Sequence, residues 1–310
     1  MRIVSKSLAL VLFVVLAAWA LLSERGLAED AGGGPPSAAA AAAAPALTGG
    51  DAAWRHDPLW DDGRAEYCAY EVEWARYGEL WPGRALLVLV KEPWAPELDV
   101  KADAPRRDGF DVLKLNHVRD VPTGIYTYHQ MASAFLRRDR GEVVKLATSS
   151  AEACGLTTAE LVDGRLATRS YFDGQGDRTV AYPGGLPEDA LPALLRDAVA
   201  APEGALPQAV DVFPSLLAGK LPPLVPESFA LERREVGELR VPAGSFPAVA
   251  VELRNDSGSR TYRFEQAPPH RLLAYDGADG TTYRLARCDR LAYWQRNRPG
   301  DEEWWPRSLR

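Results

Sequence analysis

Side chains that could bind a ligand are concentrated in one stretch, LKLNHVRDVPTGIYTYHQMASAF, which covers residues 113–135. The candidate ligand-binding residues in it, which are polar or aromatic, are Lys114, Asn116, Tyr126, Tyr128 and His129. In an extended chain Lys114 and Asn116 share one face of a strand, and so do Tyr126 and Tyr128. These residues could line a polar, aromatic cleft. The alternative is a sheet whose second face meets water, which is common in antiparallel sheets, and we favour that alternative.

No other group of residues has the spacing that metal, cofactor or catalytic chemistry needs. The histidines are His56, His117, His129 and His270, and no two of them are as close in sequence as zinc ligands usually are. The segments DGQGD and DGADG are too short for a calcium loop, and Gly219-Lys220 lacks the flanking residues of a phosphate loop. Cys154 could act as a nucleophile only with a base beside it. We therefore predict no metal, no cofactor and no catalytic residue.

The elements that must hold these side chains are short runs of alternating apolar and polar residues, separated by turn residues. AEYCAYEVEW, which starts at Ala65, alternates in this way, whereas RALLVLV at 84–90 is apolar on both faces. Many such runs at close spacing predict a mainly β fold: a large antiparallel sheet, a sandwich or an open barrel. Strands that are apolar on both faces must be covered on both, either because the sheet packs on itself or because a groove takes a ligand.

One helix interrupts the β pattern, at 190–199 within LPEDALPALLRDAVAAPEG. Asp189 is placed to cap it, and Pro192 falls in its first turn, where a missing N–H is harmless. Its apolar stripe is Leu191, Leu194, Leu195 and Ala198. A short helix of this kind can cover only part of a sheet.

The stretch VPAGSF predicts a turn rather than a catalytic motif. Pro242 fits the second position of a type I turn and Gly244 the fourth, so the chain should reverse here between two strands. Ser245 is not a nucleophile elbow, because the second glycine of that motif is absent.

Composition divides the chain into parts. Arg2 and Lys6 precede an uncharged run at 7–22, which is typical of a secretory signal that is either cleaved after Ala28 or kept as an anchor. The predicted parts are a signal peptide or anchor (1–28), a low-complexity linker (29–53) and a single β-rich domain (54–310). Within that domain, the helix and a Pro-rich connection (187–225) join two β-rich halves (54–186 and 226–310).

Charge and cysteine content narrow the possible partners and leave the disulfide question open. The net charge of −7 argues against nucleic acid, which requires clustered Lys and Arg. The cysteines are Cys68, Cys154 and Cys288. In an exported chain they allow one disulfide with one thiol left over, or three small buried residues.

Several stretches resemble a family of exported bacterial envelope proteins of unknown function. VPAGSFPAVAVEL and YRFEQAPPHRLLAYDGADGTTYRLARC match a pattern in which a V-P-A-G-x-F turn precedes strands, a Pro-and-basic turn and a final strand. GRAEYCAYEVEWARYGELWPGRALLVLVKEPW and VLKLNHVRDVPTGIYTYHQMAS resemble a related envelope group. The resemblance covers most of 54–303 and implies no particular activity. Some relatives carry the label of a septum formation inhibitor, which we do not adopt because the enzymes of that name are α/β and cytosolic. Many relatives also have a lipobox cysteine, which this chain lacks.

These observations predict an exported protein of the periplasm or cell envelope, either free or anchored by residues 7–22. We favour a non-enzymatic protein that binds a lipid, another hydrophobic ligand or an envelope component on a face of its sheet. The alternatives are a hydrolase that uses residues 113–135 and a structural or assembly factor of the envelope. A deep apolar pocket would favour the ligand-binding protein, and a cluster of His or Cys with a carboxylate would favour the hydrolase.

Overall fold

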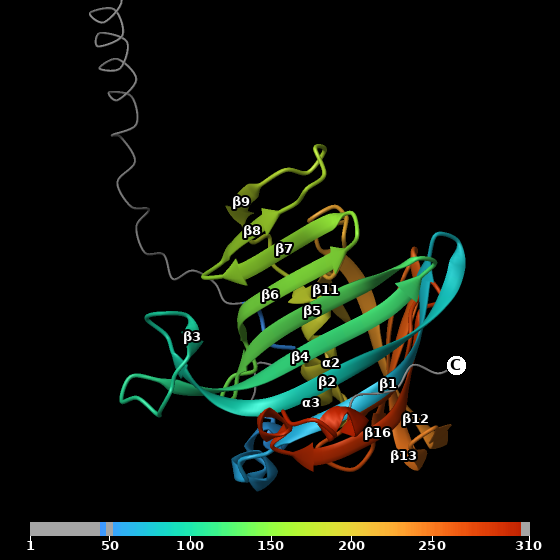
Figure 1. Cartoon of the computed structure of the whole chain (residues 1–310). Coiled ribbons are helices and arrows are strands. Elements are labelled where there is room, and N and C mark those ends of the chain that lie inside the picture. The colour runs from blue at the N-terminus through green and yellow to red at the C-terminus, as the bar shows by residue number, and fades with distance from the viewer. Residues whose placement is uncertain (1–43, 48–51, 305–310) are drawn as a thin grey trace, which may run out of the picture. The chain divides into compact units, whose positions relative to one another are not determined.

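One large sheet contains every strand of the described part of the chain. The computed structural model describes residues 44–47 and 52–304, so the predicted signal peptide or anchor (1–28) and most of the linker lie outside the described residues. The sheet has 16 strands in the order β10-β11-β12-β13-β14-β15-β16-β1-β2-β4-β5-β6-β7-β8-β9, and β3 pairs with β2. Neighbours are antiparallel except β10 and β11. The sheet stays open between β9 and β10, so the predicted mainly β fold with an antiparallel sheet is confirmed (Figure 1).

The bounds of the elements follow the chain order. The strands are β1 (Ala65–Arg76), β2 (Glu79–Ala95), β3 (Val100–Lys101), β4 (Phe110–Thr123), β5 (Tyr126–Arg137), β6 (Val143–Glu152), β7 (Gly155–Val162), β8 (Arg165–Arg169), β9 (Arg178–Ala181), β10 (Leu186–Pro187), β11 (Ala209–Phe213), β12 (Glu227–Val241), β13 (Gly244–Asn255), β14 (Gly258–Glu265), β15 (Leu272–Asp276) and β16 (Thr282–Leu291). The helices are η1 (Ala53–His56), η2 (Pro58–Asp61), η3 (Glu188–Ala190), α2 (Leu191–Leu194), α3 (Arg196–Ala200), η4 (Tyr293–Gln295) and η5 (Asp301–Trp304). None of these helices is both long and apolar enough to cross a membrane.

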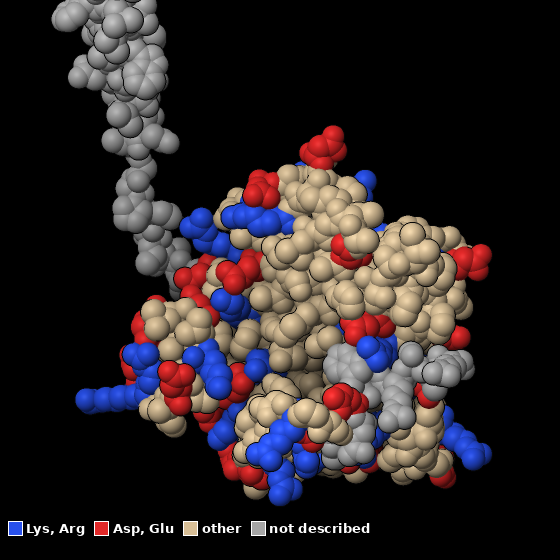
Figure 2. All heavy atoms as spheres, in the orientation of Figure 1, with Lys and Arg blue, Asp and Glu red and all other residues tan. Residues whose placement is uncertain are grey.

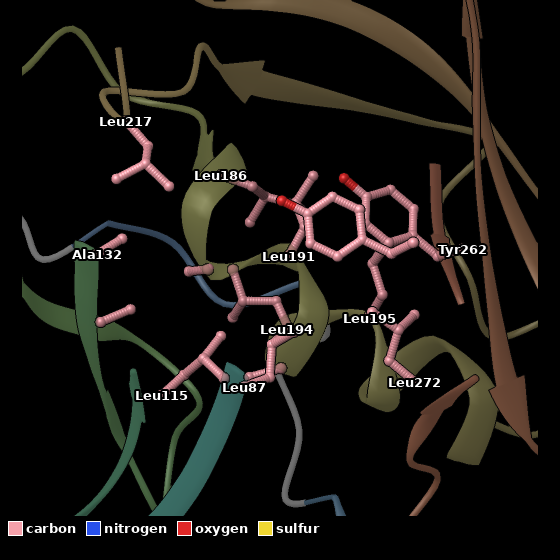
Figure 3. Close-up of a cluster of buried hydrophobic side chains, with 14 of the residues drawn as sticks. Leu87, Leu115, Ala132, Leu186, Leu191, Leu194, Leu195, Leu217, Tyr262 and Leu272 are labelled. Carbon is pink, nitrogen blue, oxygen red and sulfur yellow. The ribbon is translucent and has the colours of Figure 1, made fainter. Parts of the chain in front are cut away.

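The helical segment η3–α2–α3 lies on the inner face of the sheet. In Figure 1, α2 and α3 lie behind β2 and β4. The predicted apolar stripe is confirmed, since Leu191, Leu194, Leu195 and Ala198 are at most 1% exposed. Figure 3 shows leucines of this segment between Leu87 and Leu115 on one side and Tyr262 and Leu272 on the other. The main core is therefore built by strands from both halves around one short helical segment.

The helix differs from the prediction in its continuity and its cap. A 3-10 turn precedes α2, and the segment breaks at Leu195 between α2 and α3. The expected cap at Asp189 is wrong, because its carboxylate accepts hydrogen bonds from Ser215 Oγ at 2.6 Å and Leu216 N at 2.8 Å. A carboxylate that satisfies buried donors of a neighbouring loop is no longer free to cap its own helix.

Two buried ion pairs fix α3 inside the sheet. Arg196 Nη2 lies 2.5 Å from Glu66 Oε1 on β1, and Arg55 Nη1 in η1 lies 2.5 Å from Asp197 Oδ2. Trp54 Nε1 also donates to Asp197 Oδ1, at 2.7 Å. Removing one partner of a buried pair is costly, on the order of 3–5 kcal/mol, because the other charge stays buried. These pairs therefore hold the helical segment at one position.

The strands that are apolar on both faces are covered on both faces. All six residues of 85–90 in β2 are buried. Leu87 and Leu89 belong to the main core, whereas alternate residues of the same strand pack outside it with Tyr67 and Tyr293. The residues of this smaller outer cluster are Ala65, Tyr67, Ala69, Leu86, Val88, Val90 and Leu291, with Val118 and Tyr293 against them. The segment after β16 thus supplies part of the cover that the sequence pattern requires.

The predicted linker (29–53) reaches the sheet before it ends. Ala44 forms a β-bridge with Val143, and both Ala44 and Leu47 are buried against the main core. Leu47 is the one large apolar residue of the linker. Burial of its apolar side chain stabilises the packing of residues 44–47 against the domain.

The chain reverses at Pro242 and Ala243, which join β12 and β13 as a two-residue hairpin loop. Val241 pairs with Gly244 across the loop. Gly244 has a φ of +140°, a backbone conformation that residues with a Cβ rarely adopt. Both residues of the predicted turn therefore have an architectural role here.

A disulfide joins the first long strand to the last one. Cys68 and Cys288 occupy paired positions on β1 and β16 and are bonded, while Cys154 is free and exposed. The bridge spans 220 residues of sequence. It closes the seam at which the two predicted halves of the chain meet in one sheet.

We expect replacement of both bridged cysteines, Cys68→Ser with Cys288→Ser, to lower the melting temperature by about 5–15 °C. A bridge across a loop this long restricts the unfolded chain by up to about 5 kcal/mol, and native bridges commonly contribute about 2–5 kcal/mol. Thermal unfolding followed by circular dichroism measures this. Cys154→Ser is the matched control and should melt like the parent. Equal melting of all three proteins would contradict a stabilising bridge.

Candidate functional site

A cavity of about 550 Å³ remains on the inner face beside the helical segment. The wall comes from six neighbouring strands of the sheet, β14, β15, β16, β1, β2 and β4, and the cover from η3, α2 and the connection after β11. Its apolar lining includes Trp74, Leu87, Leu217 and Leu272. This volume lies within the roughly 300–1,000 Å³ of small-molecule sites.

The alternation of β4 brings two functional side chains to this cavity. Leu113 and Leu115 point inward and are buried in the main core, so His117 and Arg119, two and four residues further on, point to the same face. Both line the cavity. The strand therefore changes from core-filling leucines to polar groups where it reaches the cavity.

Arg119 is buried, at 8% exposure, and is held by neutral groups. Its Nε donates to Gln130 Oε1 at 2.9 Å, and its Nη1 donates to the Tyr283 hydroxyl at 3.1 Å. The guanidinium carbon lies 4.7 Å from the centre of the Trp74 ring. Gln130 is itself fixed, since its Nε2 donates to Ser150 Oγ and Leu217 O. The guanidinium is thus rigidly positioned in the cavity wall.

His117 is neutral at physiological pH. Its Nε2 lies 3.1 Å from the Tyr283 hydroxyl. Burial, and then the positive charge of Arg119, lower the pKa of His117 to about 3. Burial also raises the pKa of Tyr283, so its hydroxyl keeps its proton. His117 therefore adds a polar but uncharged group beside Arg119.

The acidic groups of the lining are satisfied within the protein. Glu188 faces Arg260 at 3.3 Å and accepts from Ser215 N, and Asp189 accepts from Ser215 and Leu216. Burial raises the pKa of both Glu188 and Asp189. Asp189 thus joins the two parts of the cover, and Glu188 also joins the cover to β14.

A second arginine, Arg76, reaches the cavity from the end of β1. Its guanidinium lies 5.7 Å from the Trp74 ring centre, 4.7 Å from that of Tyr77 and 5.5 Å from that of Tyr128. Its Nη2 lies 3.4 Å from the Tyr128 hydroxyl, which is also hydrogen-bonded to the Tyr77 hydroxyl. Aromatic faces thus hold this cation next to the cavity.

The five candidate residues from the sequence do not form one site. Tyr126 and Tyr128 lie together, with ring centres 5.7 Å apart, at the aromatic cluster around Arg76. Lys114 pairs with Glu92, Asn116 accepts from Ser133 Oγ, and His129 pairs with Asp120. These three side chains lie on the face of β4 and β5 opposite Tyr128 and the cavity. Figure 2 shows a surface on which charged residues surround a hollowed centre of other residues.

Neither tyrosine belongs to the cavity lining itself, and residues from other parts of the chain do. Tyr262, Tyr275 and Tyr283 come from the C-terminal half, and Glu188 and Asp189 from the connection. No local pattern marks them, because strand alternation makes an inward tyrosine look like any other core residue. Arg119 is the exception: it stands on the inward face of a strand that begins with inward Leu113 and Leu115, which indicates a cation that is not on the surface.

No metal site is present in the described residues. No group of three or more His, Cys, Asp and Glu side chains there could hold a metal ion. The exposed Cys154 lies by Glu152, whose carboxylate raises the pKa of the thiol. His117 bonds Tyr283, and His129 bonds Asp120.

Comparison with known proteins assigns no family to this chain. No protein-family model matches the chain, and no curated protein matches it. Among solved structures, it is similar to a β-barrel-like protein of a domain of unknown function, DUF1849, from Brucella abortus. The sequence identity is 12%, the match covers 74% of this chain and 98% of that one, and the TM-score is 0.40. The resemblance to exported envelope proteins stays a prediction.

We expect the stability of the parent to fall faster on acidification than that of a His117→Gln variant. The pKa of His117 is about 3 in the folded protein against an ordinary 6.5, so between these values the unfolded chain binds more protons. Stability is then lost as pH falls below about 6.5, by at most about 1.4 kcal/mol per pH unit. Urea unfolding of both proteins at pH 7, 5.5 and 4.5 measures the difference. The contributions of Glu188 and Asp189 to the pH dependence are the same in both proteins and cancel in the comparison. Parallel pH dependences would show that His117 titrates normally.

Proposed function

We propose that this protein is exported and binds a hydrophobic ligand in the cavity on the inner face of its sheet. The observation that carries the proposal is the cavity of about 550 Å³ with its mixed apolar and aromatic wall. Protein cores are normally filled by side chains, so an unfilled space of this size next to a packed helical segment suggests a ligand site. The polar groups in the wall would orient the ligand.

The length of the helical segment, compared with that of the strands it covers, supports the same proposal. The segment 191–200 contains ten helical or near-helical residues and extends about 15 Å at 1.5 Å per residue. The 17 residues of β2 alone extend roughly 55 Å. A cover this short leaves inner surface that another molecule can bury.

The cysteines support export. A disulfide between Cys68 and Cys288 is typical of proteins in oxidising compartments, and exported proteins meet that condition. The basic start and the apolar run at 7–22 provide the means of export. A role in the envelope follows from the sequence resemblance and is part of this proposal.

Binding is tested with the uncharged fluorescent probe N-phenyl-1-naphthylamine and the purified full chain. We expect saturable binding, and at least a tenfold weaker affinity in Ala218→Trp, because Ala218 lines the cavity and an indole there would occupy it. Ala205→Trp places the same side chain on an exposed loop and should bind like the parent. Absence of saturable binding to the parent, or equal binding by both variants, would contradict the cavity as the site.

Export is tested by fusing residues 1–51 to a reporter enzyme that is active only outside the cytoplasm. We expect activity, and we expect N-terminal sequencing of the mature protein to begin at Glu29, because Ala28 ends the predicted signal. The same fusion without residues 2–22 should be inactive. An intact Met1 in the membrane fraction would show that residues 7–22 remain as an anchor, and a parent fusion without activity would contradict export.

A further inference from the structure

Arg119 differs from the other buried arginines in having no carboxylate partner. Arg55 and Arg196, which are more deeply buried, each lie 2.5 Å from an acidic side chain. Within the described residues no carboxylate oxygen lies within 4.0 Å of the Arg119 guanidinium, whose hydrogen bonds go to Gln130 and Tyr283. An arginine stays charged in a protein and has five N–H donors, of which these bonds use three. Two donors and a full positive charge are left at the cavity.

Arg76 adds a second cation without a carboxylate partner in the same part of the cavity. No carboxylate oxygen of the described residues lies within 4.0 Å of it, and its buried Nε has no hydrogen-bond partner. Both guanidinium groups lie within 5.7 Å of the centre of the Trp74 ring. Two cations close to one ring create a positive region in a wall that is partly shielded from water, where charge interactions are strong.

No acid of the lining forms a direct ion pair with Arg119 or Arg76; Glu188 has a cationic partner, and the others accept hydrogen bonds from neutral groups. Glu188 pairs with Arg260, Asp189 accepts from Ser215 and Leu216, Glu227 accepts from Asn255, and Asp279 accepts from Thr281. Burying a cation without a counter-charge costs free energy that a bound anion would offset. Asp189 acts on Arg119, and Glu152 on Arg76, only through longer-range charge interactions, so neither guanidinium has a direct ionic partner among the described residues.

We propose that Arg119 and Arg76 bind the carboxylate or phosphate head group of an anionic amphiphile whose apolar chain lies against Leu87, Leu217 and Leu272. The inference rests on the proposed hydrophobic-ligand function and specifies the class of ligand. Guanidinium groups match carboxylate and phosphate oxygens with paired N–H donors, and such charge-assisted bonds are the strongest hydrogen bonds in proteins. The cavity lining supplies both kinds of surface: two cations beside Trp74, and leucine and proline side chains.

The test is displacement of N-phenyl-1-naphthylamine from the full chain by dodecanoate, dodecyl phosphate and the matched uncharged 1-dodecanol. We expect both anions to displace the probe at concentrations at least tenfold lower than the alcohol. Arg119→Gln should weaken the binding of dodecanoate by about 10–100-fold, the range of a lost charge-assisted bond, and the binding of the alcohol by less than threefold. Arg76→Gln should weaken the binding of both anions by about 3–10-fold, a smaller effect because the Arg76 side chain is less buried. Arg119→Lys, which keeps the charge, should fall between the parent and Arg119→Gln.

The control is Arg263→Gln, which removes an arginine paired with Asp276 and absent from the cavity lining, and it should bind all three compounds like the parent. Thermal unfolding verifies that each variant is folded. If Arg119→Gln does not fold, the binding of the anions by Arg76→Gln tests the anion site instead. Equal displacement by acid and alcohol, with the arginine variants unchanged, would overturn the anion site but leave hydrophobic binding intact. If inorganic phosphate displaced the probe as effectively as dodecyl phosphate does, the proposal that the ligand is an amphiphile would be overturned. A parent that binds no probe would contradict the proposed function itself.

Discussion

The pairing of β1 with β16 is the interaction on which the rest of the structure depends. It joins the first long strand to the last, so that two runs of hairpins become one continuous sheet, and the Cys68–Cys288 bridge holds the seam. Glu66, two residues before the bridged cysteine, pairs with Arg196 of α3. Trp74 and Tyr283, which contact Arg119, stand on the same two strands. The seam therefore positions the sheet, the inner helical segment and the cavity wall together.

The cavity is a consequence of a mismatch between the sheet and its cover. Two ion pairs fix α3 near the start of β1, so the segment cannot shift to fill the other end of the inner face. The loop after β11 covers part of that end through Asp189 and Ser215. What remains is a space with leucine and proline side chains on one part and cations on another, a combination that an amphiphile would fill with little rearrangement.

Charge placement distinguishes this cavity from a packing defect. Apolar voids in cores are lined by aliphatic groups and stay dry, whereas this one has a buried guanidinium held by Gln130 and Tyr283. Gln130 is in turn bonded to β6 and to the cover, so the cation belongs to a supported network. Such a network costs free energy to bury, which is consistent with a use in binding.

The amino-acid sequence by itself determined the local structure: strands from period-two runs, an inward stripe on a short helix, and a reversal at Pro242. These depend on neighbours in sequence, and side-chain alternation of β4 likewise placed His117 with Leu113 and Leu115. Only the tertiary structure decided that Cys68 meets Cys288, that Asp189 bonds the Ser215 loop instead of capping a helix, and that the Lys114 face of β4 continues into the His129 face of β5. These outcomes depend on strand order and on contacts across as many as 220 residues. Local propensity contains no information on such pairings, because they are selected by the total burial and charge pairing of the folded chain.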